Sequence, residues 1–216
     1  LGGSIPMVRV PWNDTIWMQR TLDAGALGLV VPMVNTAADA EFAVSNCRYA
    51  TRGIRSYTSG RTGPYVESDG EYTDWANANI AVIPMIETVE AVRNAEAILA
   101  VEGVDGCFIG PRDLALSMGI TPREMGPGSE HEAMMLSVLA AGRRVGTAVG
   151  KHCFSALEMN ERIAQVCAPR PELLQRQCEK TQCIPRLLET EAGPPALIEH
   201  RDKLLVKRVT GRHELL

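Results

Sequence analysis

Apolar residues occur along residues 1–150 in short, nearly continuous runs that longer amphipathic stretches separate. The runs cover residues 6–11, 27–34, 80–87, 103–111 and 144–150. β-Branched residues are frequent in them, and polar residues do not alternate regularly with apolar ones. The pattern therefore predicts strands that are buried on both faces of a parallel sheet.

Helical spacing of apolar side chains fills most of the intervals between these runs. Residues 14–26 place Trp17 and Leu22 on one face, and residues 36–50 and 88–103 show the same spacing, each ending near a glycine. Repeated β–α units of this length predict right-handed crossovers and a parallel sheet, hence an α/β fold. The pattern alone leaves two architectures open, an open doubly wound sheet and a closed (β/α)₈ barrel.

Two segments depart from this alternation. Residues 52–79 are rich in Gly, Ser, Tyr and charge, and are longer than an ordinary connection. We interpret them as a functional loop. From about residue 166 prolines are scattered and no further β–α unit is recognisable. This change predicts a main domain over residues 1–165 and an irregular or helical tail over residues 166–216.

Charge and cysteine usage narrow the setting of the protein. The formal net charge of −4 argues against nucleic acid or an acidic membrane surface as the main partner. No apolar run approaches the ~18 residues of a membrane span, and no signal peptide is visible. The six cysteines form no C-x-x-C pair, which fits a reducing, cytoplasmic location. Because Leu1 stands in place of an initiating Met, we expect a processed or partial chain.

Two carboxylates stand where predicted strands end. Glu87 closes the run 80–87, and Asp113 follows the run 103–111, one β–α repeat later. The carboxyl ends of parallel strands meet at one edge of a sheet, so both side chains are expected there. Two converging carboxylates repel each other unless a cation or a shared proton intervenes, and a hard ion such as Mg²⁺ or Mn²⁺ prefers such oxygens. The pattern also fits a plainer role, in which both acids offset the dipole at a helix start.

Further candidates flank these carboxylates. Arg55 could hold a substrate carboxylate through two parallel hydrogen bonds, or could be a solvated loop arginine. Gly110 to Asp113, with Arg112 between them, could offer backbone N–H groups to an anion at a helix start. His131 lies in an acidic approach rich in Gly and Pro, where we expect a surface position.

Two stretches of the sequence carry a family resemblance. "VRVPWNDTIWMQRTLDAGALGLVVPMVN" and "PMIETVEAVRNAEAILAVEGVDGCFIGPRDLALSMG" resemble the HpcH/HpaI aldolases, which are metal-dependent class II pyruvate aldolases. The resemblance covers about residues 5–165. It implies a (β/α)₈ TIM-type barrel that is incomplete here, without the family's first two strands and last strand.

The resemblance also implies roles for individual residues. Glu87 and Asp113 would bind a divalent metal ion such as Mg²⁺, Mn²⁺ or Co²⁺. Arg55 would hold pyruvate and act in catalysis, and Gly110, Arg112 and Asp113 would bind the substrate carboxylate. Met85 occupies a place that is Gln in many members of the family.

The implied activity is that of a carbon–carbon lyase. Such an enzyme cleaves or forms 4-hydroxy-2-oxoacids, with pyruvate as the enolate component and an aldehyde as the other partner, as in the catabolism of aromatic compounds. A homo-oligomer is expected. The loop 56–79, with Arg61, Tyr65, Tyr72 and Trp75, is the segment in which we expect contacts to the aldehyde.

Two other functions remain open from the sequence. The family's base is a histidine in a D-x-E-H block, and this sequence contains no such block. The chain could therefore be an inactive family member that binds metal or pyruvate, or that associates with other subunits. A citrate-lyase-like relative with an acyl-CoA substrate is a further alternative.

Overall fold

The computed structural model describes residues 5–58, 69–153 and 155–167 of the 216-residue chain. They fall into two compact units, one that extends to Lys151 and a second that starts at His152. The second unit contributes α8 (Ala156–Cys167), a helix that runs past the boundary predicted after residue 165. The tail predicted for residues 168–216 lies outside the described residues and stays a prediction.

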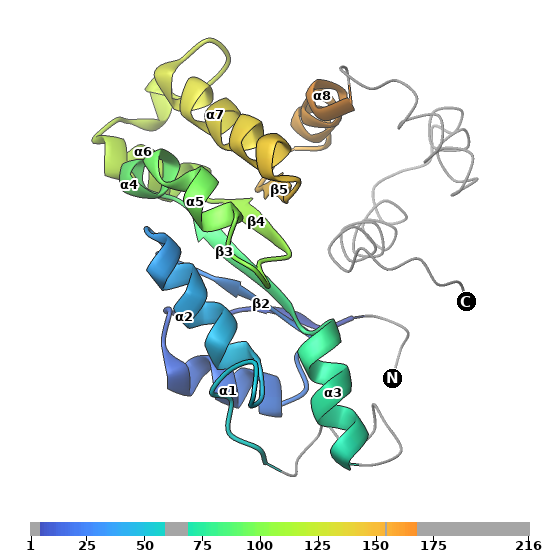
Figure 1. Ribbon diagram of the computed structural model, residues 1–216. Helices are drawn as coiled ribbons and strands as arrows, with labels where there is room; N and C mark the ends of the chain where they lie inside the picture. Colours follow the sequence, from blue (N-terminus) through green and yellow to red (C-terminus); the bar gives the residue numbers. More distant parts are fainter. Residues whose placement is uncertain (1–4, 59–68, 154, 168–216) are drawn as a thin grey trace, which may run out of the picture. The chain divides into compact units, whose positions relative to one another are not determined.

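Among the described residues of the first unit, five strands form one parallel sheet (Figure 1). They are β1 (Met7–Arg9), β2 (Gly28–Val31), β3 (Ala81–Ile86), β4 (Gly106–Ile109) and β5 (Ala148–Lys151). Each strand overlaps one of the five runs predicted from the sequence. Their order across the sheet follows their order along the chain. A doubly wound sheet reverses its strand order at a switch point, so this sequential order is that of consecutive barrel strands; the barrel is not closed within the described residues.

Helices follow the strands in sequence. They are α1 (Thr15–Asp23), α2 (Ala37–Cys47), α3 (Asp69–Asn79), α4 (Val89–Arg93), α5 (Ala95–Leu99), α6 (Pro111–Met118), the 3₁₀ turn η2 (Pro122–Glu124) and α7 (Glu130–Val145). Asp14 is the N-cap of α1, and its carboxylate accepts hydrogen bonds from the backbone N–H groups of Ile16 and Trp17. Within the described part of the chain, no helix has both the length and the apolar character needed to cross a bilayer.

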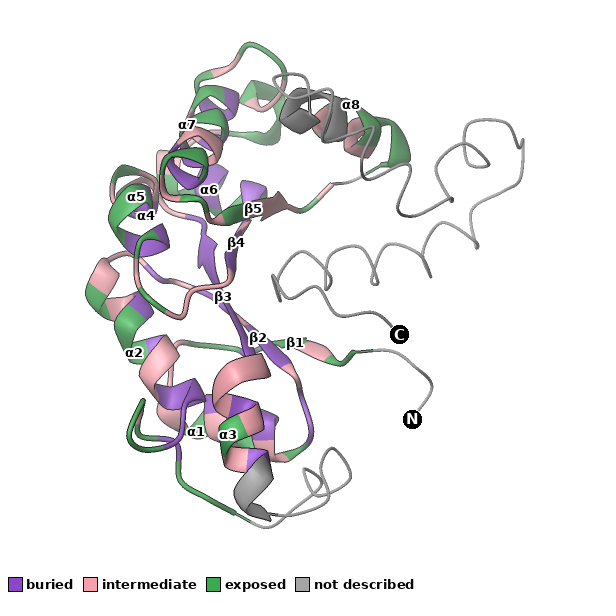
Figure 2. Ribbon diagram, turned by 45° about the vertical axis from the view of Figure 1, so that its right-hand side comes forward, coloured by how far each residue is buried: buried purple, intermediate pink, exposed green. Residues whose placement is uncertain are grey.

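The main hydrophobic core lies between the sheet and its helices. Figures 1 and 2 show α2, α4, α5 and α7 on one side of the sheet. Leu29 and Val82 belong to this core and are fully buried. Alternate residues of β3, such as Ile83 and Met85, are buried too but lie on the opposite face, because successive strand residues point to opposite sides. The same alternation directs Glu87 to the face that Met85 occupies.

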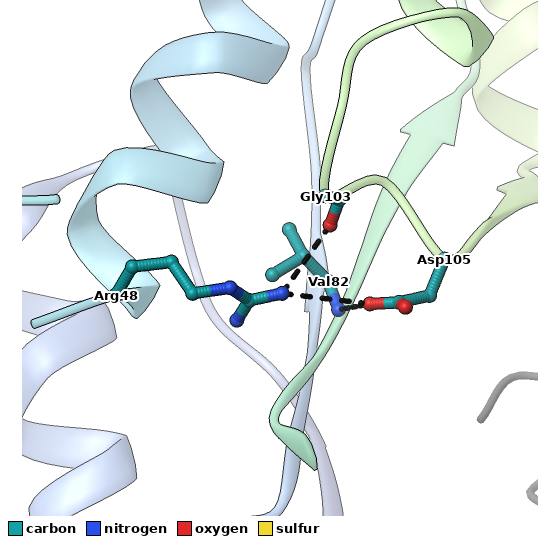
Figure 3. Close-up of polar contacts among 4 residues, drawn as sticks. All are labelled: Arg48, Val82, Gly103 and Asp105. Carbon is teal, nitrogen blue, oxygen red and sulfur yellow. Dashed lines mark hydrogen bonds and ion pairs between the residues drawn. The ribbon is translucent and has the colours of Figure 1, made fainter. Parts of the chain in front are cut away.

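The amino ends of β3 and β4 are joined by a partly buried polar cluster (Figure 3). The Asp105 carboxylate accepts a hydrogen bond of 2.8 Å from the Val82 N–H and lies 3.8 Å from the Arg48 guanidinium. The same guanidinium donates to the carbonyl of Gly103 at 3.4 Å. Burial raises the pKa of the Asp105 carboxyl, and the Val82 N–H and Arg48 oppose that shift. The cluster ties the end of α2 to both strands.

The segment expected to be a loop over residues 56–79 is helical in its second half. Residues 69–79 form α3, in which Tyr72 is buried in the core and Trp75 packs against it. The apolar spacing of three residues between these two rings is helical, and it accounts for the difference. Tyr72 and Trp75 thus serve packing, whereas Arg61 and Tyr65 lie outside the described residues.

Candidate metal and anion site

Glu87 follows β3 directly and is the central side chain of the candidate site. Its residue is 3% exposed. Its Oε1 atom accepts a hydrogen bond of 2.8 Å from the backbone N–H of Met33, which follows β2. Met33 has φ = 56°, in the left-handed region that costs a residue with a side chain about 1–3 kcal/mol. This strained turn aims a backbone donor at the carboxylate and fixes one of its oxygens.

The loop after β2 is held to the end of β3 by further hydrogen bonds. The Thr88 hydroxyl donates to Asn35 Oδ1 at 2.5 Å, and the Asn94 side chain donates to the Asn35 carbonyl at 2.8 Å. Thr88 also caps α4, since its hydroxyl oxygen accepts from the Ala91 N–H at 3.0 Å. The backbone on both sides of Glu87 therefore has a defined position.

Gly110 brings β4 and α6 against the same carboxylate. A Cβ atom at Gly110 would lie 2.8 Å from Glu87 Oε2 and 2.9 Å from Glu87 Cβ, closer than real Cβ contacts. Glycine therefore permits this approach and alanine does not. Gly110 is also the N-cap of α6 and provides no side-chain cap. The first turn of α6 thus presents a helix start of the kind that attracts anions.

Asp113 lies in that first turn and reaches Glu87. The Asp113 carboxyl lies close enough to Glu87 for the two groups to influence each other. Burial is the largest influence that raises the pKa of Glu87, and the negative charge of Asp113 adds to it. The Met33 N–H and the positive charge of Arg9 lower the pKa of Glu87. The structure thus brings Glu87 and Asp113 together, and their role as metal ligands stays a prediction.

Arg9 is a site residue that the sequence reasoning missed. It is the last residue of β1, it is exposed, and its charge acts on Glu87. By the alternation of β1 it shares a face with Met7, whose sulfur would lie 2.3 Å from a Cβ at Gly28. The signal was present in the sequence, because a single cation interrupts the apolar run "PMVRVP" just where a strand ends.

Arg55 has partners other than those expected of a substrate-binding arginine. Its Nη2 atom forms an ion pair of 3.0 Å with Asp23, the last residue of α1. Its guanidinium carbon lies 4.6 Å from the ring centre of Tyr49 and 5.8 Å from that of Tyr72. Of these two arginines, Arg9 is the one whose charge influences Glu87. The structure thus does not bring Arg55 to the carboxylate pair, since Asp23 precedes β2 and Glu87 follows β3.

The remaining predicted residues surround the pair. Arg112 is the exposed second residue of α6, and Met85 is buried, with its terminal methyl carbon 3.2 Å from a Cβ placed on Gly110. Among the described residues, no group of three or more His, Cys, Asp or Glu side chains gathers into a metal cluster. Glu87 and Asp113 thus form a pair of oxygen donors, which suits a hard cation that keeps part of its shell for water and substrate.

Comparison with known proteins identifies the family to which the chain belongs. Residues 2–169 match the family model described as HpcH/HpaI aldolase/citrate lyase. A hydroxypyruvate/pyruvate aldolase from Rhizorhabdus wittichii is 38% identical over 192 residues, which cover 85% of this chain and 74% of that protein. A 5-keto-4-deoxy-D-glucarate aldolase from Escherichia coli K12 is 40% identical over 116 residues, covering 54% of this chain and 45% of the relative, so this chain spans less than half of that protein.

A solved structure supports the same relationship. A HpcH/HpaI aldolase/citrate lyase family protein from Burkholderia cenocepacia superimposes with a TM-score of 0.67 at 30% identity. The superposition covers 80% of this chain and 73% of that protein. The chain belongs to the HpcH/HpaI aldolase/citrate lyase family.

Proposed function

We propose that this chain is a divalent-metal-dependent carbon–carbon lyase that uses pyruvate as its enolate component. One observation carries the proposal. The Glu87 carboxylate, with Oε1 held by the Met33 N–H and Oε2 against Gly110, meets the Asp113 carboxyl at the carboxyl ends of β3 and β4. A capping role for Glu87 would not require the backbone of Gly110 to pack so closely against its carboxylate, so this packing favours a ligand pair.

The donor set fits a hard metal ion. Glu87 and Asp113 would hold Mg²⁺, Mn²⁺ or Co²⁺ through carboxylate oxygens, and the bare backbone of Gly110 leaves room beside Oε2. When bound, such an ion supplies Lewis acidity toward the oxygens of a 2-oxoacid. The two carboxylates also stop repelling each other once a cation neutralises them.

Arg9 takes the role that the sequence had suggested for Arg55. The positive charge of its guanidinium lowers the pKa of Glu87, and the residue is exposed to an incoming substrate. We infer that Arg9 stabilises the negative charge that develops on the keto oxygen of pyruvate. The first turn of α6, with Gly110 and Arg112, would receive the pyruvate carboxylate.

The reaction that these groups support is a reversible aldol cleavage. In a 4-hydroxy-2-oxoacid the C4 hydroxyl loses its proton, the C3–C4 bond breaks, and an aldehyde leaves. The electrons of the broken C3–C4 bond form the enolate of pyruvate. This enolate then takes up a proton at C3. Arg9 and the helix start hold the negative charge that develops during this step.

The name of one relative supports pyruvate as the enolate component. The Rhizorhabdus wittichii relative is named as a hydroxypyruvate/pyruvate aldolase, and the Escherichia coli relative as a 5-keto-4-deoxy-D-glucarate aldolase. Both names describe aldolases of 2-oxoacids, and they differ in the second component. We therefore keep the aldehyde and the oligomeric state as predictions from the sequence.

Exchange of the pyruvate methyl protons for deuterium tests the proposal without an aldehyde. We expect NMR to show exchange that requires Mn²⁺ or Mg²⁺ and that fails in Glu87→Gln and Arg9→Met, while Arg55→Met retains it if folded. Release of pyruvate from a 4-hydroxy-2-oxoacid then tests cleavage. Metal binding without exchange would favour the inactive family member instead, and absence of metal binding would refute the metal site.

A further inference from the structure

His131 is buried in the structure, although its sequence context suggested the surface. The residue is 1% exposed, at the second position of α7. Its Nε2 atom lies 2.7 Å from the backbone carbonyl oxygen of Pro111. A carbonyl oxygen only accepts, so Nε2 carries the proton and donates it. Nδ1 has no hydrogen-bond partner in the described chain, so the Pro111 carbonyl is the polar contact that orients the ring.

The acceptor of this hydrogen bond stands inside the candidate site. Pro111 is the first residue of α6, between Gly110, whose backbone abuts Glu87, and Asp113. As a proline it has no N–H with which to hold the turn itself. The His131 ring therefore anchors the segment that carries one of the two proposed ligands.

The donor side of this hydrogen bond is rigidly built. Ser129 caps α7 by accepting a hydrogen bond of 3.1 Å from the Glu132 N–H, and the Glu132 side chain accepts one of 2.7 Å from the Gly128 N–H. These contacts fix the first turn of α7, and α7 packs against α6. The His131 ring thus transmits the position of α7 to the start of α6.

We propose that His131 is a positioning residue, which holds the first turn of α6 so that Asp113 and Glu87 face the same metal ion. This inference rests on the proposed function. Gly110 approaches Glu87 so closely that a methyl group does not fit, so a small shift of the turn changes the separation of the two carboxylates. Groups that orient metal ligands typically change affinity 10–100-fold when lost.

Three substitutions separate the hydrogen bond from packing. His131→Gln places an amide donor close to the position of Nε2, whereas His131→Asn is too short and His131→Leu removes the donor and keeps the bulk. Val138→Ala is the matched control, since Val138 is fully buried in the same helix, away from its first turn. The affinity for Mn²⁺ is measured on the full chain by titration calorimetry, with circular dichroism to confirm folding.

The expected result is Mn²⁺ affinity that falls about tenfold in His131→Leu and His131→Asn and stays within about twofold of wild type in His131→Gln. Val138→Ala should lose stability but retain Mn²⁺ affinity. Unchanged affinity in His131→Asn, or a loss in His131→Gln equal to that in His131→Asn, would overturn the positioning role and leave the metal site standing. A wild-type chain that does not bind Mn²⁺ would refute the proposed function itself.

A measurement on the unmodified chain tests the same inference if the variants do not fold. Nitrogen-15 NMR of the histidine rings reports which nitrogen carries the proton. We expect His131 to show a protonated Nε2 whose hydrogen exchanges slowly, and its resonance to shift when Mg²⁺ is added. A proton on Nδ1 instead of Nε2 would contradict the inference. So would a His131 resonance that does not shift although Mg²⁺ binds to the chain.

Discussion

Glu87 has its two carboxylate oxygens in different surroundings. Oε1 accepts the Met33 N–H, and Oε2 lies beside the bare backbone of Gly110. A carboxylate with one oxygen engaged in this way has a fixed orientation and offers the other oxygen to a cation. The Glu87 side chain is thus oriented by Met33 and Gly110, both of which contribute only backbone atoms.

A methyl group at Gly110 should disturb this arrangement directly. In Gly110→Ala the new Cβ would lie within 2.9 Å of two Glu87 atoms, so the carboxylate or the turn of α6 must move. We expect the free energy of unfolding to fall by about 1–3 kcal/mol and Mn²⁺ affinity to fall at least tenfold. Urea denaturation and calorimetric titration measure the two effects.

Gly150→Ala is the control for that substitution. Its Cβ would meet one neighbour, the Cys107 carbonyl oxygen, at an ordinary distance of 3.6 Å. We expect this variant to retain both stability and Mn²⁺ affinity. Equal loss of affinity in both variants would mean that the close approach of Gly110 to Glu87 has no special role.

Two buried cysteines should be inert in the folded chain. Burial raises the pKa of the Cys47 and Cys107 thiols to about 12, so both remain neutral at pH 8. Since the thiolate is the reactive form, iodoacetamide should modify them slowly until urea unfolds the chain, whereas half-buried Cys153 serves as the comparison. Mass spectrometry of the labelled peptides checks this, and rapid labelling of Cys47 without denaturant would contradict it.

The same thiols give stability a pH dependence. In the unfolded chain they ionise near pH 8.5, well below their folded pKa of about 12. The folded state therefore holds these protons more tightly, and the thiols favour the unfolded state as the pH rises from about 8.5 toward 12. Urea denaturation at pH 8 and pH 10 should show lower stability at the higher pH. Cys47→Ala should weaken this dependence.

Individual site residues were predictable from the sequence to different degrees. Glu87 and Asp113 follow apolar runs of recognisable length, so strand-end geometry alone placed them at the same edge. Arg55 was assigned by a local motif, and the structure pairs it with Asp23, 32 positions earlier in the chain. No periodicity reports such a contact. Arg9 is recognisable in the sequence as a single cation in an apolar run. Its relevance to the site, however, depends on β1 lying close enough for the charge of Arg9 to influence Glu87.

At the scale of elements, strand β3 is held at both ends by polar contacts from other segments. Its carboxyl end meets Met33 and Gly110, and its amino end meets Asp105, which accepts from the Val82 N–H (Figure 3). Arg48 closes the latter cluster from the end of α2. Because β3 lies at the centre of the sheet, its register positions the strands on both sides.

Loss of the Asp105 carboxylate should therefore destabilise the chain. Asp105→Ala leaves the Val82 N–H without its acceptor and the buried Arg48 without its counter-charge, at a cost of about 2–4 kcal/mol in the free energy of unfolding. Asp105→Asn keeps an oxygen for the Val82 N–H and should cost less. Urea denaturation at pH 7 compares the two variants, and an equal loss in both would show that the charge of Asp105 is the important feature.

The elements themselves were largely predictable, apart from those whose boundaries depend on tertiary contacts. All five strands overlap apolar runs, because a strand covered on both faces needs apolar residues throughout. The helix predicted over 88–103 divides at Asn94, whose side chain donates to the Asn35 carbonyl across the fold. Helix α3 was missed because its composition is typical of a loop. The sequence does not indicate that Tyr72 is buried against the core.

At the scale of the molecule, the candidate site is assembled from four successive β–α units. Arg9 comes from β1, Met33 follows β2, Glu87 follows β3, and Asp113 lies in α6 after β4. None of these units contains the site alone, so a ligand that binds the assembled site must stabilise the packing of all four. Metal binding at the proposed site would consequently be coupled to global stability.

This coupling gives a prediction that needs no substrate. A ligand that binds only the folded state adds about 2.7 kcal/mol to the free energy of unfolding at a concentration of 100 times its Kd. We expect Mn²⁺ to raise the thermal midpoint of the wild-type chain by several degrees, and to leave that of Glu87→Gln unchanged. Glu96→Gln removes an exposed carboxylate paired with Arg144, so its Mn²⁺ shift should equal that of wild type. Loss of the shift in Glu96→Gln as well would show that Mn²⁺ acts through general surface charge, and persistence of the shift in Glu87→Gln would show that the metal binds at another place in the chain.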